Sequence, residues 1–398
     1  MANAEALDRC PADTTSNISP LAEKQRPIHR SVRALERNAD VFVWWTTNTL
    51  IACFNAQVTP VTPEVLLRWI GMPIDMIRSG EIIVKRVRLE HRAVLNYGVH
   101  PLELIQGSEN LSPGVYGCYF RDIPDPTDIP EDLRPISPGI HVRTFKQIRE
   151  DHEGHVRENP WMWPSDQIER TNSKFYTIPD ALRSGVTVAH DRCIFTGYPR
   201  NATASDASTD PMSAATTGVT SGAAAEDPVE LYWIVPKKMG GENGTKHLTK
   251  EEWWSSNNIL PMCSGVHELW FNNELSVDAN DGYRICTFSE AAASVIEGLP
   301  ERLDSPNPEW ALYFRLHLLH TRLLRFCGGD IRTEYGYRRM ADLGARIADT
   351  DAVANRKAAI WETEMGKDAL ELLDAGHQLG LATSDDEDGA SDSEEEEV

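Results

Sequence analysis

The stretch of sequence that decides the fold reads Asn257-Asn258-Ile259-Leu260, followed by Val266-His267-Glu268-Leu269-Trp270-Phe271-Asn272. It continues through residues typical of a strand to Asp281-Gly282-Tyr283-Arg284-Ile285. Two segments precede it along the chain, Arg192-Cys193-Ile194-Phe195-Thr196-Gly197 and Tyr232-Trp233-Ile234-Val235-Pro236. The information lies in the combination, because short motifs become specific only in a fixed order and spacing.

Taken in this order, the segments resemble the HNH endonuclease family, in the branch common in fungal proteins. That family's pattern is Cys-x-x-Thr-Gly, a strand ending Ala-His-Ile-hydrophobic-Pro, an Asn-Gly-Leu-Leu-Leu segment, and His-x-x-Phe-Asp with a hairpin closing on an acidic-Gly-Tyr turn. The match covers about residues 185–330, and Phe314-Arg-Leu-His317 fits the histidine-containing helix of this branch. The resemblance implies an α+β fold around a ββα-metal unit, with one divalent ion, Mg²⁺ or Zn²⁺, beside the scissile phosphate of a nucleic acid.

The family pattern assigns a role to each matching position. His267 falls on the metal-binding histidine, and Asn258 takes the place of the asparagine that orients the general base, with Asn257 as the alternative one register away. The general-base histidine is missing, since Trp233 occupies its position and Tyr232 the one before it. An indole has no basic nitrogen, so Trp233 can neither accept a proton nor bind a metal ion. The resemblance therefore predicts an HNH module with impaired hydrolysis.

Each of these residues also has a structural interpretation. His267 can be a packed helix histidine without a metal, Asn258 can hold a turn, and Trp233 can fill a core or form a stacking platform for a base. His317 and His320 lie three residues apart on one face of a predicted helix. They can form a metal pair, or they can be buried histidines with satisfied hydrogen bonds.

The charge balance limits the choice of partners. With 39 basic and 61 acidic side chains, the net charge is −22, which argues against coating DNA or anionic lipid by bulk charge. A local basic cleft stays compatible with this balance. The lysines that lie near the motif are the predicted phosphate contacts. They are Lys237, Lys238, Lys246 and Lys250.

Composition divides the chain into five regions. Ala, Ser and Thr fill 17 of the 28 positions from 201 to 228, too polar a stretch to bury a core, and nine acids without a base follow Thr383. The expected regions are a disordered N-terminus (1–30), a mixed α/β region (31–180), an HNH nuclease-like domain (181–330) with a disordered insertion (201–228), a C-terminal helical region (331–380) and an acidic disordered tail (381–398).

Hydrophobic patterning locates the main elements. Strands are expected over residues 41–45, 50–54, 82–89, 115–120 and 229–235. Caps, prolines and glycines predict helices from Thr62-Pro63 to Gly71, from Ser289 to Gly298, from Asn307-Pro308 to Gly328, and from Thr350 or Asp351 to about Ala375.

Cysteine usage and hydropathy indicate the compartment. The seven cysteines include no CxxC pair, which argues against a disulfide framework or a four-cysteine zinc site, and we expect Cys193 to be a small buried hydrophobe. No apolar run reaches the length of a membrane helix, and the first 30 residues lack a secretory signal. The sequence predicts an intracellular protein, cytoplasmic or nuclear, with no membrane partner.

Three functional hypotheses remain. The first is an HNH-type module with lost or impaired catalysis that retains nucleic-acid or metal binding. The second is an active metal-dependent endonuclease with an atypical base. The third is a non-catalytic interaction scaffold that acts through its C-terminal helices and binds a basic protein through its acidic tail.

Overall fold

The structure is a computed structural model that describes residues 30–45, 49–105, 108–122, 133, 135, 142–158, 177–189, 191–199, 228–236, 248–304, 306–333, 345 and 359–374. Helices and strands are mixed along these residues, so the protein has the α+β character that the sequence predicts. The three segments expected to be disordered lie outside the described residues, apart from Arg30 and Pro228.

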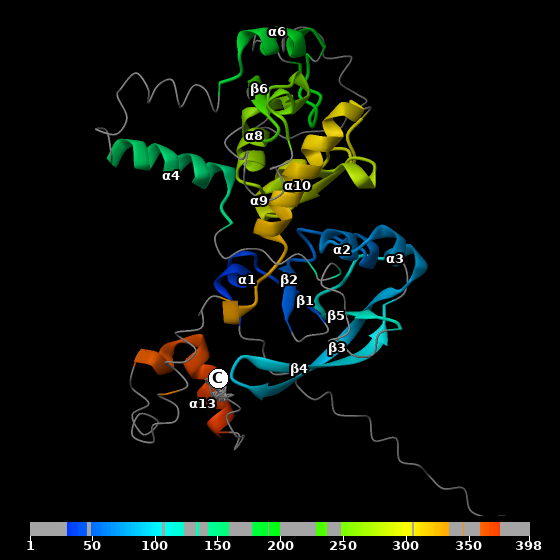
Figure 1. Ribbon diagram of the computed structural model, residues 1–398, viewed down its shortest axis with the longest axis vertical. Coiled ribbons are helices and arrows are strands. Elements are labelled where there is room, and N and C mark those ends of the chain that lie inside the picture. The colour runs from blue at the N-terminus through cyan, green and yellow to red at the C-terminus, as the bar shows by residue number, and fades with distance from the viewer. Residues whose placement is uncertain are drawn as a thin grey trace, which may run out of the picture.

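A five-stranded sheet forms the lower half of the molecule in Figure 1. Its order is β2-β1-β5-β3-β4, with β1 parallel to β5 and the other neighbours antiparallel. All five residues of β1 and of β2 are buried, which explains their unbroken apolar sequences. The strands are β1 (Val41–Trp45), β2 (Leu50–Phe54), β3 (Ile82–Ala93), β4 (Asn96–Leu104) and β5 (Gly114–Phe120).

Short helices accompany this sheet. They are α1 (Val32–Glu36), α2 (Pro63–Trp69) and α3 (Ile74–Ser79). Helix α2 begins where the sequence predicts, because Thr62 Oγ1 accepts a hydrogen bond from Val65 N and Pro63 occupies the first turn.

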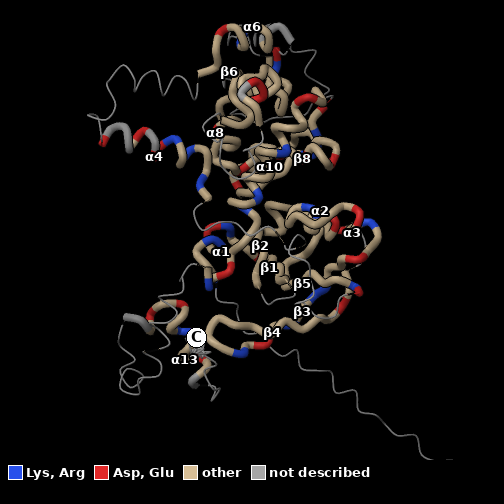
Figure 2. Tube along the Cα trace, viewed as in Figure 1, with Lys and Arg blue, Asp and Glu red and all other residues tan. Residues whose placement is uncertain are grey.

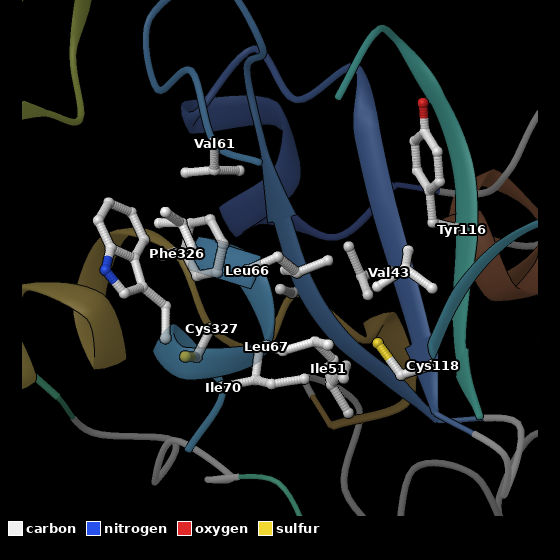
Figure 3. Packing of buried hydrophobic residues seen from close by; sticks show 14 of the residues in the cluster. Val43, Ile51, Val61, Leu66, Leu67, Ile70, Tyr116, Cys118, Phe326 and Cys327 are labelled. Carbon is white, nitrogen blue, oxygen red and sulfur yellow. The ribbon is translucent and has the colours of Figure 1, made fainter. Parts of the chain in front are cut away.

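Residues from far along the chain complete the core of the sheet. Leu66 of α2 belongs to one cluster with Val43 and Tyr116 of the sheet, and Phe326 and Cys327 join the same cluster (Figure 3). The ring of Phe326 is fully buried there. Folding of the sheet therefore depends on a segment more than 250 residues downstream of β2.

The upper half of the molecule in Figure 1 consists of short strands and helices. Strand β6 pairs with β7, and β8 pairs with β9, in antiparallel ribbons. Helix α10 runs down from this half toward the sheet. The elements are α4 (Phe145–Glu158), α6 (Asp180–Ala189), β6 (Val229–Trp233), α7 (Lys250–Trp253), β7 (Ile259–Cys263), α8 (Ser264–Phe271), β8 (Leu275–Asp278), β9 (Arg284–Thr287), α9 (Glu290–Ile296) and α10 (Ala311–Arg325).

The two halves exchange residues across the domain boundary expected at residue 180. Phe145 and Ile148 of α4 pack in the core of the upper half, whereas Phe288 and Leu318 pack in the core of the sheet. A second contact is polar, because the buried carboxylate of Asp278 accepts hydrogen bonds from the side chains of two residues of α2. Residues from both sides of position 180 therefore contribute to each of these two cores.

Arg37 joins the end of α10 to the edge of the sheet. Its guanidinium donates to the backbone carbonyl of Cys53 in β2 at 2.9 Å, and to those of Leu324, Phe326 and Cys327 at 2.8 to 3.0 Å. A helix leaves its last carbonyls without intrahelical partners, and a cation at that end also suits the helix dipole. Arg37 thus caps α10 and connects it to β2 at once.

The C-terminal helix α13 (Glu364–Asp374), preceded by a 3-10 turn over Ala359–Glu362, lies beside the β3–β4 hairpin (Figure 1). Asp368 is fully buried there, and its carboxylate lies 2.9 Å from His91 Nε2 and accepts a hydrogen bond from Leu95 N. The helix expected from Thr350 or Asp351 is thus confirmed over its second part, while residues 351–358 lie outside the described chain.

The other predicted elements agree with the structure. The strands predicted over residues 41–45, 50–54, 82–89 and 115–120 are β1, β2, β3 and β5, and the helices predicted near Ser289 and Asn307 are α9 and α10. Strand β6 ends at Trp233, two residues earlier than predicted. No helix within the described ranges is long and apolar enough to cross a membrane.

Replacing Arg37 with alanine tests the connection between helix and sheet. We expect the free energy of unfolding of Arg37→Ala to fall by about 3 kcal/mol, because hydrogen bonds from a charged donor contribute about 1.5–3 kcal/mol and the carbonyls are left without a partner. Urea denaturation measures the change. Arg78→Ala, at an exposed position of α3, is the control and should stay within about 0.5 kcal/mol of wild type. Equal effects of the two substitutions would contradict the proposed cap.

Candidate functional site

A strand, strand, helix unit carries or adjoins the three predicted site residues that are not lysines. In the β6–β7 ribbon, Tyr232 lies opposite Leu260 and Trp233 opposite Ile259. Helix α8 begins directly after β7, and it is tied back to the ribbon because Trp270 Nε1 donates a hydrogen bond to Ile234 O at 2.9 Å. The ribbon and the helix together position His267, Asn258 and Trp233.

Asn258 fixes the chain just beyond the end of β6. Its side chain is fully buried. Its Oδ1 accepts a hydrogen bond from Val235 N, and its Nδ2 donates to Val235 O, both at 3.0 Å. One amide therefore satisfies both backbone groups of Val235. The neighbouring Asn257 is only partly buried, so Asn258 is the residue of the pair that holds the loop.

His267 lies against aromatic rings at the mouth of a cleft. Its imidazole stacks on the ring of Tyr232, with centroids 3.5 Å apart and planes 11° apart, and Phe271 lies 5.4 Å away. Burial, and secondarily the positive charge of Arg149, lower the pKa of His267 to about 4. The imidazole is therefore neutral near pH 7.

Trp233 points away from this histidine. Successive strand residues face opposite sides, and Tyr232 occupies the side facing His267. Trp233 packs instead with Ile178 and Val186, near and on α6, and meets the ring of Trp254 edge to face at 5.9 Å. Its exposed fraction is 6%. Trp233 therefore packs in a core in this structure.

Two adjoining cavities of about 290 and 240 Å³ form the cleft. They share Arg149, His267 and Phe271, so they are parts of one hollow. Asn258 is not among the lining residues. The hollow lies between α4, α6, β6 and α8. The remaining lining residues are Lys146, Glu150, Glu153, Thr177, Ile178, Arg183, Glu230, Leu231, Tyr232, Trp233, Pro236 and Glu268.

Helix α4 forms one wall of the cleft and is held by α8 and α10. Asn273, one residue beyond the C-cap of α8, accepts a hydrogen bond from Phe145 N and donates one to Thr321 Oγ1 of α10. His320 Nε2 lies 2.9 Å from Arg143 O, just ahead of α4. The position of this wall is therefore fixed by buried hydrogen bonds to both helices.

The charges in the cleft are mixed. Figure 2 shows basic and acidic residues along α4. Arg149 donates to Glu153 at 2.8 Å, and Lys146 lies 3.6 Å from Glu268. Lys146, Arg149 and Arg183 were not predicted as site residues. The signal for two of them was the spacing of Lys146 and Arg149, because residues three apart share a helix face, but nothing local connected that face to residues beyond 230.

The predicted phosphate contacts fall mostly outside the described residues. Lys237, Lys238 and Lys246 lie outside the described residues, and Lys250 is described only as the first residue of α7. The described residues instead supply Lys146, Arg149 and Arg183 to the cleft.

His317 and His320 are buried histidines rather than an exposed pair, and within the described residues His320 Nδ1 has no hydrogen-bond partner. His317 Nδ1 accepts from Ser276 Oγ at 2.8 Å while its Nε2 donates to Trp270 O at 3.2 Å, and its ring stacks on Trp270 at 3.6 Å. Burial lowers the pKa of His317 far below the usual value and that of His320 less strongly. Both imidazoles are therefore uncharged and connect α10 to neighbouring elements by hydrogen bonds.

The resemblance implies a divalent metal, and the described side chains can be tested as its ligands. Within the described ranges, no group of three or more His, Cys, Asp or Glu side chains is placed to hold an ion. His267 lines the cleft, but Tyr232 covers one face of its ring and Trp233 supplies no donor. The described residues do not fit the implied ion, and the Mg²⁺ or Zn²⁺ ion stays a prediction.

Comparisons of the chain with models of protein families, with curated proteins and with solved structures found no match.

Replacing Asn258 with alanine tests its structural role. We expect Asn258→Ala to lower the free energy of unfolding by about 3 kcal/mol, because the buried N–H and C=O of Val235 both lose their partner. Asn257→Ala is the matched control and should change stability by no more than about 0.5 kcal/mol. Thermal and urea unfolding measure both variants, and a larger loss for Asn257→Ala would exclude this assignment of the register.

The pKa of His267 predicts a pH dependence of stability. The unfolded chain takes up a proton near pH 6.5, whereas the folded chain resists protonation down to about pH 4, so stability falls as the pH drops through that window. Between pH 7.5 and 4.5 this group should account for a loss of about 2–3 kcal/mol. His267→Phe keeps an aromatic ring but cannot titrate, so it should lose that much less than wild type in urea unfolding at the two pH values. Identical losses would show that His267 is not buried as described.

Proposed function

We propose that residues 181–330 form a degenerate HNH-type module, which retains the strand, strand, helix unit as a binding scaffold and has lost hydrolysis. Support comes from the order of the Cys-x-x-Thr-Gly turn, β6, β7 and α8, which matches the order of the family's motifs. The observation that carries the proposal is at the end of β6, where Tyr232 stacks on His267 and Trp233 faces the opposite core.

The loss of hydrolysis follows from the available bases. Trp233 cannot accept a proton. His267 has a pKa of about 4, and a general base works best when its pKa lies near the operating pH. A histidine with this pKa takes a proton from water poorly near pH 7. The cleft is therefore better suited to holding a ligand than to activating water.

The chemistry of the cleft favours a single-stranded nucleic acid. Lys146, Arg149 and Arg183 offer positive charge, and aromatic groups such as Phe271 line the same hollow. Grooves that bind single strands combine cations for the backbone with rings on which bases stack. The four glutamates of the cleft outnumber its three cations, so we expect weak binding that is strongest at low salt.

A second candidate is the interaction scaffold, and the same glutamates favour it. Glu150, Glu153, Glu230 and Glu268 line the cleft together with its cations. Mixed charges over an apolar floor also suit a peptide with basic residues, since complementary charges fix the orientation of a partner. This candidate predicts that nucleic acid is not retained at any salt concentration.

Fluorescence anisotropy with single-stranded DNA and RNA oligonucleotides tests nucleic-acid binding by the full chain. We expect binding at about 50 mM salt that is lost by about 200 mM. The double variant Lys146→Ala/Arg149→Ala should reduce the slope of log K against log salt by about two, because each phosphate contact contributes about one. Arg78→Ala, remote on α3, should bind as wild type does. Absence of binding at low salt would reject this function and favour the scaffold.

A plasmid assay with Mg²⁺, Mn²⁺ or Zn²⁺ tests hydrolysis separately. We expect intact plasmid under all three conditions, because no base of suitable pKa occupies the end of β6. Nicking that disappears in His267→Ala would overturn the proposal and establish an active endonuclease.

A further inference from the structure

Cys193 and Cys263 are 70 positions apart in sequence and adjacent in the fold. The turn that contains Cys193 is closed by hydrogen bonds from Gly197 N to Cys193 O and from Cys193 N to Tyr198 O, both 2.8 Å long. Ile194 N donates to Pro261 O, which places the turn along the end of β7. Cys193 and Cys263 are both buried in the core of the upper half.

A threonine hydroxyl lies beside this pair within the apolar core. Thr196 Oγ1 lies 3.4 Å from Cys263 Sγ. A side-chain hydrogen bond with Cys263, supported by hydrogen bonds from Thr196, lowers the pKa of Cys193 below its usual value, although burial acts in the opposite direction. Cys263 is also the N-cap residue of α8, and the positive end of a helix stabilises a thiolate.

The other buried thiols differ in this respect. Burial raises the pKa of Cys118 to about 12 and that of Cys327 to about 11, and it raises the pKa of Cys286 as well. A thiolate, not a thiol, reacts with oxidants. Of these residues, Cys193 is the one whose surroundings favour the reactive form.

We propose that Cys193 and Cys263 form a redox-active dithiol, which a small peroxide converts into a disulfide between the turn and the N-terminus of α8. The Cys193 thiolate attacks one oxygen of hydrogen peroxide, the O–O bond breaks, and the leaving hydroxide takes a proton to form water. Cys263 sulfur then attacks the Cys193 sulfenic acid. The S–S bond forms, the S–O bond breaks, and the second hydroxide leaves as water with the proton of Cys263. Two thiols are oxidised, and one peroxide is reduced to two waters.

The location of the pair gives the reaction a consequence for the cleft. His267 lies four residues after Cys263, one turn along α8. A disulfide at the start of this helix fixes its N-terminus to the turn at 193–197 and changes the environment of the face that carries His267. The dithiol is independent of the proposed function, since it requires neither nucleic acid nor a metal.

Peptide mapping after peroxide treatment of the full-length protein tests the proposal. We expect a loss of two hydrogens in the intact mass and a cross-linked peptide pair containing Cys193 and Cys263. This pair should form at least about tenfold faster than Cys118 or Cys286 is oxidised, because reactivity rises with the thiolate fraction. Differential alkylation of wild-type protein measures the rates without any substitution.

Cys193→Ser and Cys263→Ser should each abolish the cross-link, and Cys118→Ser should leave it unchanged. In Cys263→Ser, Cys193 should accumulate as sulfenic acid, which a dimedone-type reagent traps. Oxidation of Cys193 no faster than that of Cys118, or oxidation beyond sulfenic acid without the cross-link in wild-type protein, would overturn the proposal.

Discussion

The guanidinium of Arg37 is the contact on which the relation between the two halves depends. It binds backbone carbonyls of β2 and of the residues that end α10, so one side chain fixes both the edge of the sheet and the end of the long helix. The segment after α10 then continues along β2, where Gly328 N donates to Ile51 O and Ala52 pairs with Cys327. Phe326 is thereby directed into the core of the sheet.

From this anchor, α10 determines the geometry of the upper half. His317 connects it to β8 through Ser276 and to α8 through Trp270. Thr321 and His320 connect it to the start of α4. The two walls of the cleft, which carry His267 and Arg149, are thus both held in place by α10. Burial keeps His317 and His320 neutral, so neither places an unpaired charge in the core.

The frame around the cleft is held by contacts that need no catalytic side chain. Asn258 still fixes the loop beyond β6, because an amide can satisfy the N–H and C=O of Val235 together. Position 233 holds an indole that packs with residues near and on α6. The frame is supported by backbone hydrogen bonds and apolar packing, neither of which needs a basic side chain at position 233. A binding role is compatible with that arrangement.

Local sequence signals were sufficient for most elements. Thr62-Pro63, Ser289 and Asn307-Pro308 begin helices because capping and a fixed proline φ act over a few residues. The apolar runs of β1 and β2 predicted these strands equally well. The prediction of where β6 ends was less accurate. The strand stops early because Asn258, 23 residues later in the chain, hydrogen-bonds the backbone of Val235. No local pattern reports such a distant partner.

The sequence by itself determined the α+β character, the order of the motifs, and the absence of a histidine at position 233. Only the tertiary structure decided which residues meet. It brought Lys146 and Arg149 of α4 to His267, placed Cys193 against Cys263, and packed Trp233 on the side of β6 opposite to His267. The physical reason is that secondary structure follows from interactions between near neighbours, whereas a site is assembled by packing and buried hydrogen bonds between distant segments, whose partners no local spacing specifies.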